Sequence, residues 1–207
     1  MNYRLFLMYF LFVLNLFSIG LLSKKNITNN EKTLLARLIF HEASGTNINQ
    51  KTREAIAWVI YNRMNSHKFG NSVLRVIFEK NQFSGVSPDE VWTIENKIIK
   101  NKWERSFYYK NLDSREQREY ARAYKAVLKV FNKKQRDKDP TKGAVFFHSP
   151  RSREYTDNEC NRKDPSLKAP GWLCEKLQKG TLEEILIDGV LPHIFRFYRL
   201  TGDVLKK

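Results

Sequence analysis

Acidic residues and cysteines are both scarce in this chain. Asp and Glu number 22 against 37 Lys and Arg, which leaves a formal net charge of +15 at neutral pH. Such an excess favours polyanionic partners, namely nucleic acid, anionic lipid headgroups or the acidic polymers of a bacterial envelope. The two cysteines, with no histidine close to them in sequence, are too few for a structural metal site. We therefore expect neither a metal nor a cofactor.

The N-terminal segment is strongly apolar and almost free of charge. After Arg4, an apolar run extends over residues 5–22, and the sequence turns polar at Ser23. A charged start, an apolar stretch and small residues near its end predict an export signal. The run is also long enough to span a bilayer. Residues 1–23 are therefore expected to be a signal peptide or an N-terminal membrane anchor, and the rest of the chain to be exported to the periplasm or cell envelope.

Export bears on the cysteines and on the choice of partner. Cys160 and Cys174 lie in a polar segment, and in an oxidising compartment such a pair predicts a disulfide. Two free thiols are the alternative. The extracytoplasmic location and the lack of a recognised nucleic-acid-binding motif both argue against nucleic acid as the partner.

Apolar residues recur at helical spacing in four segments after the leader and a polar linker at 24–30. The dense apolar block of the second segment predicts a central, buried helix. The expected helices cover residues 31–43, capped by Asn30, then 50–66, 73–78 and 115–131, with Ser114 and Gln117 as a capping box for the last.

The C-terminal third changes character. Residues 139–143 have the composition of a turn, and short strands are expected at 144–148, 185–190 and 193–198. Residues 88–110 are charged and aromatic and are expected to be helical only in part. Helices followed by a small β element predict one α+β, mainly α domain over residues 31–207.

Glu42 is the residue most indicative of chemistry. Helical spacing places it on the same stripe as Leu35 and Leu38. Burial there, together with the negative end of the helix dipole, should raise its pKa. A carboxyl that keeps its proton at neutral pH is what glycosidic cleavage needs to protonate the leaving oxygen. The alternative is a solvated glutamate or a salt bridge to Arg37 or Arg63.

Five segments resemble a known family. Residues 35–45, LARLIFHEASG, resemble the opening motif of the SleB-type cell wall hydrolases, the spore-cortex-lytic enzyme family. The family's other strings follow in order: "AVVLNR" at 57–63, "VIYQKGQFS" at 76–84, "DPTGGALYY" at 139–147 and, more loosely, "GNHVFY" at 192–198.

The resemblance implies a lysozyme-like fold and a lytic transglycosylase, more than a muramidase, acting on MurNAc-β-1,4-GlcNAc bonds of peptidoglycan. It implies that Glu42 is the single acid/base and that the product ends in 1,6-anhydroMurNAc. A hydrolase with two carboxylates would need a partner for Glu42. Asp139 and Asp188 are the acidic residues expected to act if water proves to be the acceptor.

Several further residues are candidate sugar contacts. Gln82, Phe83 and Ser84 match the family's cleft loop, although Phe83 could instead pack inward. Phe146 and Phe147 stand where the family commonly has Tyr, so a hydroxyl contact is missing there. Trp172 could stack on a sugar or belong to the core.

Two functional classes remain open. The first is a monomeric enzyme whose partner is the peptidoglycan glycan strand. The second is a non-catalytic, basic envelope-binding module that retains Glu42 only as a structural residue. The intact Glu-Ala-Ser-Gly segment at 42–45 and the Gln-Phe-Ser segment at 82–84 favour the enzyme.

Overall fold

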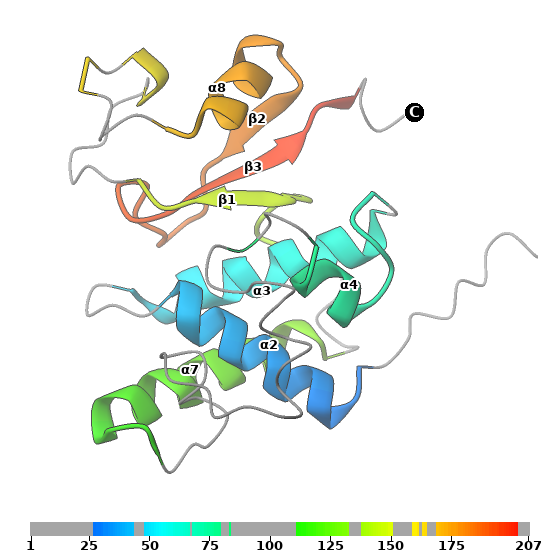
Figure 1. Cartoon of the computed structure of the whole chain (residues 1–207), viewed down its shortest axis with the longest axis vertical. Coiled ribbons are helices and arrows are strands. Elements are labelled where there is room, and N and C mark those ends of the chain that lie inside the picture. Colours follow the sequence, from blue (N-terminus) through cyan, green and yellow to red (C-terminus); the bar gives the residue numbers. More distant parts are fainter. Residues whose placement is uncertain are drawn as a thin grey trace, which may run out of the picture.

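The computed structural model describes residues 27–43, 48–66, 68–79, 83, 111–132, 138–150, 159–161, 163–164 and 169–202. The expected leader at 1–23 and the segment 88–110 lie outside these ranges. None of the helices within the ranges combines the length and the apolarity that a bilayer span requires. Helices occupy one layer, and a small sheet covered by one helix forms the other (Figure 1).

The first described helix, α2 (Asn29–Glu42), starts earlier than expected and reaches into the predicted linker. Thr28, not Asn30, is its N-cap: the Thr28 hydroxyl accepts from the Glu31 backbone, and the Glu31 carboxylate accepts from the Thr28 backbone N–H at 2.7 Å. This reciprocal capping box satisfies two backbone donors at once, which an asparagine two residues later does not do.

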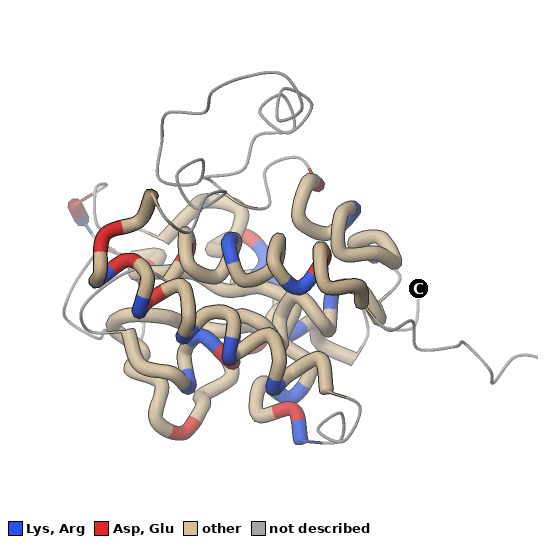
Figure 2. Tube along the Cα trace, turned by 90° about the horizontal axis from the view of Figure 1, so that it is seen from below, with Lys and Arg blue, Asp and Glu red and all other residues tan. Residues whose placement is uncertain are grey.

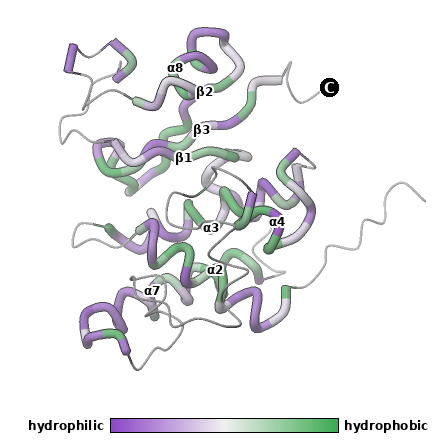
Figure 3. Tube along the Cα trace, in the orientation of Figure 1, coloured by the Kyte–Doolittle hydropathy of each residue, from purple (hydrophilic) through white to green (hydrophobic). Residues whose placement is uncertain are grey.

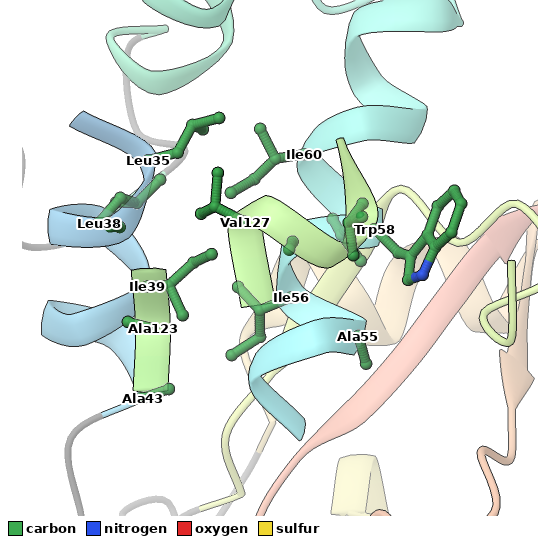
Figure 4. Packing of buried hydrophobic residues seen from close by; sticks show 14 of the residues in the cluster. Leu35, Leu38, Ile39, Ala43, Ala55, Ile56, Trp58, Ile60, Ala123 and Val127 are labelled. Atoms are coloured by element: carbon green, nitrogen blue, oxygen red, sulfur yellow. The ribbon is translucent and has the colours of Figure 1, made fainter. Parts of the chain in front are cut away.

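The predicted central helix is confirmed as α3 (Gln50–Asn65), in which residues 55–60 are all buried. The short α4 (Val73–Ile77) follows, close to its predicted bounds. Side chains from α2, α3 and α7 meet in one apolar cluster, where Leu38, Ile56 and Val127 come from the three helices (Figure 4).

The helix α7 (Ser114–Val130) is hydrophilic along most of its length (Figure 3). Its capping box is Asp113 with Glu116, one residue ahead of the predicted pair, because the Asp113 carboxylate accepts from two backbone N–H groups. On this helix Leu128 is exposed, and the buried positions are Ala123, Ala126, Val127 and Val130. The alanines let α7 lie close against α2 and α3, and its larger rings pack only at the margin.

The sheet has three antiparallel strands in the order β1-β3-β2, so the last strand along the chain is central. The strands are β1 (Phe146–His148), β2 (Leu182–Ile185) and β3 (Arg196–Leu200). The predicted strands at 185–190 and 193–198 are confirmed only in part, because β2 ends at Ile185 and β3 covers residues 196–198 of the second segment. Turns occupy much of the rest: Val190 N–H bonds Ile187 O, Gly189 has a φ of 75°, and Ile194 N–H bonds Leu191 O.

A helix that was not predicted, α8 (Gly171–Gln178), covers the sheet and buries Leu173. A disulfide joins Cys174 on α8 to Cys160 on the short 3₁₀ helix η3 (Glu159–Asn161). Together, the two layers confirm a mainly helical α+β chain. Lys and Arg positions are spread over the helices and the sheet, not gathered on one element (Figure 2).

We expect thiol titration of the unreduced, denatured protein to find no free thiol. The pairing ties η3 to α8 across a separation of 14 residues, and the same titration after reduction should find two thiols, the number of cysteines in the chain. Two free thiols in protein recovered from the envelope would contradict the bridge.

Candidate active site around Glu42

Glu42 is the last residue of α2, at the edge of the helical core. Its side chain is 14% exposed, whereas Leu35 and Leu38 on the same stripe are fully buried. The predicted position of Glu42 on the buried stripe is therefore confirmed. The side chain keeps this small exposure at the protein surface, while its Oε1 atom is buried.

Burial dominates the electrostatics of this carboxyl. Desolvation raises the pKa of Glu42 from 4.5 to about 7, and the nearby positive charge of Arg63 opposes the rise. The Nδ1 atom of His41, the preceding residue, lies 4.0 Å from Oε1 of Glu42. That oxygen makes no hydrogen bond within the described part of the chain. Glu42 can therefore hold its proton near neutral pH.

Arg63 is the buried cation of the site. It extends from α3, is 3% exposed, and donates from Nε to the Val145 carbonyl at 2.6 Å. Three phenylalanine rings surround its guanidinium carbon, at 5.2 Å for Phe69, 5.1 Å for Phe83 and 5.7 Å for Phe146. Burial lowers the pKa of Arg63 to about 10, so it remains charged at neutral pH.

Glu79 is a second carboxylate that interacts with Arg63. Its charge, like that of Glu42, raises the pKa of Arg63, and its Oε2 atom is buried without a hydrogen bond to any described residue. Glu79 was not predicted from the sequence as a residue of the site. The available signal was its position in segment 76–84, where the family string has Gln.

Some of the expected sugar contacts lie outside the described residues, and the others are phenylalanine rings near Arg63. Gln82 and Ser84 lie outside the described residues. Phe83 and Phe146 are buried beside Arg63. Phe147 is half-buried and packs against Phe83 at 6.2 Å between ring centroids. These rings lie where they can shape the wall of a cleft, and a direct contact with sugar stays a prediction.

Trp172 is the candidate ring that is open to solvent. It lies on α8, is 43% exposed, and contacts Phe146 at 5.6 Å between ring centroids. Arg63 and Trp172 thus flank the same Phe146 ring. A stacking role for Trp172 stays a prediction.

Asp139 and Asp188, the expected second carboxylates, are both committed elsewhere. Asp139 accepts four hydrogen bonds, from the backbone and hydroxyl of Thr141, the backbone of Gly143 and the Asn62 amide. Asp188 is 98% exposed and pairs with Lys51 at 2.7 Å. Asp139 thus ties the turn at 139–143 to α3 through the Asn62 amide.

Other concavities lie away from Glu42. Hollows of about 330, 370 and 440 Å³ are lined by described residues, and Glu42 lines none of these three. Within the described ranges, no three His, Cys, Asp or Glu side chains are grouped so that they could hold a metal ion.

Comparison with known proteins agrees with the motifs. The cell wall hydrolase family model matches residues 49–166, more than half of the chain. This range includes Arg63, Glu79 and Asp139, and Glu42 precedes it. The spore cortex-lytic enzyme of Bacillus subtilis (strain 168) is 36% identical over 97 residues, which cover 42% of this chain and 31% of that protein. The alignment thus spans less than a third of the relative's length. No solved structure matches the chain. On the family match, the chain belongs to the cell wall hydrolases.

Proposed function

We propose that this chain is a lytic transglycosylase of lysozyme-like fold that cleaves MurNAc-β-1,4-GlcNAc bonds in peptidoglycan. The observation that carries the proposal is the carboxyl of Glu42, buried at the end of α2 with a pKa of about 7, in a chain of the cell wall hydrolase family. The expected leader at 1–23 would place a monomeric enzyme in the cell envelope, free or membrane-anchored.

The reaction needs one group that first gives and then takes a proton. Glu42 protonates the glycosidic oxygen as the bond from that oxygen to C1 of MurNAc breaks. The resulting carboxylate then removes the proton from the 6-hydroxyl of the same sugar, and the freed oxygen bonds C1. A 1,6-anhydro ring is closed, Glu42 is protonated again, and no water is consumed.

The 6-hydroxyl is favoured over water because it is held in the same molecule at high effective concentration. Among the described carboxylates, Asp139 is occupied by its hydrogen bonds and Asp188 by Lys51. Glu79 faces the charge of Arg63. Glu42 therefore acts in this scheme without a carboxylate to activate water.

Mass spectrometry of digested peptidoglycan tests this proposal. We expect muropeptides that end in 1,6-anhydroMurNAc, lighter by one water than a reducing end and resistant to borohydride. Reducible MurNAc ends would contradict the transglycosylase, and Glu79→Gln would then identify the second carboxylate by abolishing their formation. Binding to sacculi without cleavage would instead support the envelope-binding module.

A further inference from the structure

Arg63 connects the two layers of the fold at the active site. Its Nε atom donates to the carbonyl of Val145, the residue that precedes β1, and the Val145 N–H donates to Tyr198 O of β3 at 2.9 Å. The guanidinium is thereby fixed relative to the sheet while its backbone belongs to α3. The helix α3 runs beneath β1 (Figure 1).

The phenylalanine cage fixes the plane of the guanidinium and excludes water from it. Phe69, Phe83 and Phe146 come from three separate segments of the chain. Each ring attracts the cation through its quadrupole, more strongly where water is excluded. The planar guanidinium of arginine can contact rings with its faces and donate hydrogen bonds in its plane. The ammonium group of lysine cannot do both.

The remaining hydrogen-bonding capacity of this cluster is not used within the described residues. Nη1 of Arg63, Oε1 of Glu42 and Oε2 of Glu79 are all buried and make no hydrogen bond there. The three groups come from α3, the end of α2 and the segment after α4. A fixed positive charge therefore interacts with both carboxyl groups.

We propose that Arg63 is the positioning residue of this site: fixed by Val145 and the three rings, it stabilises the carboxylate of Glu42 after the proton has been given to the leaving oxygen. This role rests on the proposed function. The reaction requires Glu42 to alternate between the acid and the carboxylate, and burial destabilises the carboxylate form. A fixed cation nearby offsets this destabilisation. Arg63 acts through Glu42 and makes no bond in the reaction.

The charges that face this carboxyl determine the sign of each expected change. Arg63 favours the carboxylate, so its removal should raise the pKa of Glu42. Glu79 shares Arg63 and carries the opposite charge, so its removal should lower that pKa. His41, 4.0 Å away on α2, is kept in all variants.

The test is a ¹³C NMR titration of the Glu42 carboxyl in the full chain, assigned through Glu42→Gln. We expect the pKa of Glu42 to rise by about 1 in Arg63→Gln and to fall by roughly 0.5 in Glu79→Gln, since the loss of a nearby charge shifts a pKa by about that much. The alkaline limb of sacculus clearing should move in the same direction in each variant, because the acid must be protonated to act.

Arg196→Gln is the matched control. Arg196 is equally buried, at 4%, and also pairs with two glutamates, Glu159 at 3.6 Å and Glu184 at 3.5 Å. Its loss removes the same charge from the sheet and should leave the pKa of Glu42 where it is. An equal shift in Arg196→Gln would overturn the specific role of Arg63.

Four other outcomes are decisive. An unchanged pKa in folded Arg63→Gln would overturn the proposal. If that variant does not fold, Glu79→Gln decides alone: a fall supports the shared charge, and a rise or no change overturns it. Complete loss of cleavage in Glu79→Gln would give Glu79 a direct chemical role and overturn the scheme. Shifted pKa values in a protein without cleavage would contradict the proposed function and leave the charge coupling intact.

Discussion

Replacement of Glu42 by glutamine is expected to lower the rate of sacculus clearing by about 10²–10⁴-fold, the range that a positioned acid/base group supplies. Glutamine keeps the shape and the buried position of the side chain, and it has no proton to give to the leaving oxygen. Turbidity of purified sacculi measures the rate. Retention of more than about a tenth of the wild-type rate would exclude Glu42 as the acid.

The pH dependence of the stability of Glu42→Gln tests whether this variant is folded. Because burial raises the pKa of Glu42 from 4.5 to about 7, the folded protein holds this proton more tightly than the unfolded chain. Its stability falls as pH rises from about 4.5 to about 7 and stays low above that range. Glutamine avoids this cost, so urea unfolding at pH 8 should show the variant more stable by a margin on the order of 3 kcal/mol. The difference should vanish near pH 4.

Asp139→Ala is expected to destabilise the fold by about 3 kcal/mol, because each lost hydrogen bond contributes roughly 1 kcal/mol. The carboxylate accepts from Thr141, Gly143 and Asn62 at distances between 2.6 and 2.9 Å. Its loss removes one of the contacts that tie the positive-φ turn at Lys142 and Gly143 to α3, where the Asn62 amide also donates to Thr141 and Ala144. Urea unfolding at neutral pH measures the change.

Asp188→Ala is the control for that experiment, since Asp188 is an exposed turn carboxylate paired only with Lys51 in what is described. It should leave the unfolding midpoint nearly unchanged. Asp139→Ala with wild-type stability would show that the four hydrogen bonds are not what holds the turn.

The helices could be located from sequence because their evidence is local. Apolar spacing and the dense block at 55–60 identify α2 and α3 whatever the rest of the chain does. The caps were displaced because several adjacent residues can cap a helix, and the reciprocal bond of Thr28 with Glu31 decides among them. The strands near 185–198 could be predicted only in part, because the bounds of short antiparallel strands depend on distant partners, here Leu182 against Leu200. The helix α8 is too short for apolar spacing to reveal it.

The candidate site could also be predicted from the sequence only in part. Glu42 could be found because burial on its own helix predicts the raised pKa. The cage of Arg63 could not, because Phe69, Phe83 and Phe146 become neighbours only when the sheet packs on α3. The four hydrogen bonds accepted by Asp139 could not be predicted either, because their donors come together only in the folded turn.

Because β3 is the central strand and the last along the chain, the sheet can form only after the helices. The helices α2, α3 and α7 can pack as soon as residue 132 has been synthesised, but β1 and β2 have no partner until residues 196–200 follow. The Val145 N–H bonds β3, and Val145 in turn holds Arg63. A nascent chain with its helices folded therefore still lacks the sheet contact that orders Arg63, so on the proposed mechanism cleaving activity would arise only after residues 196–200 have been added.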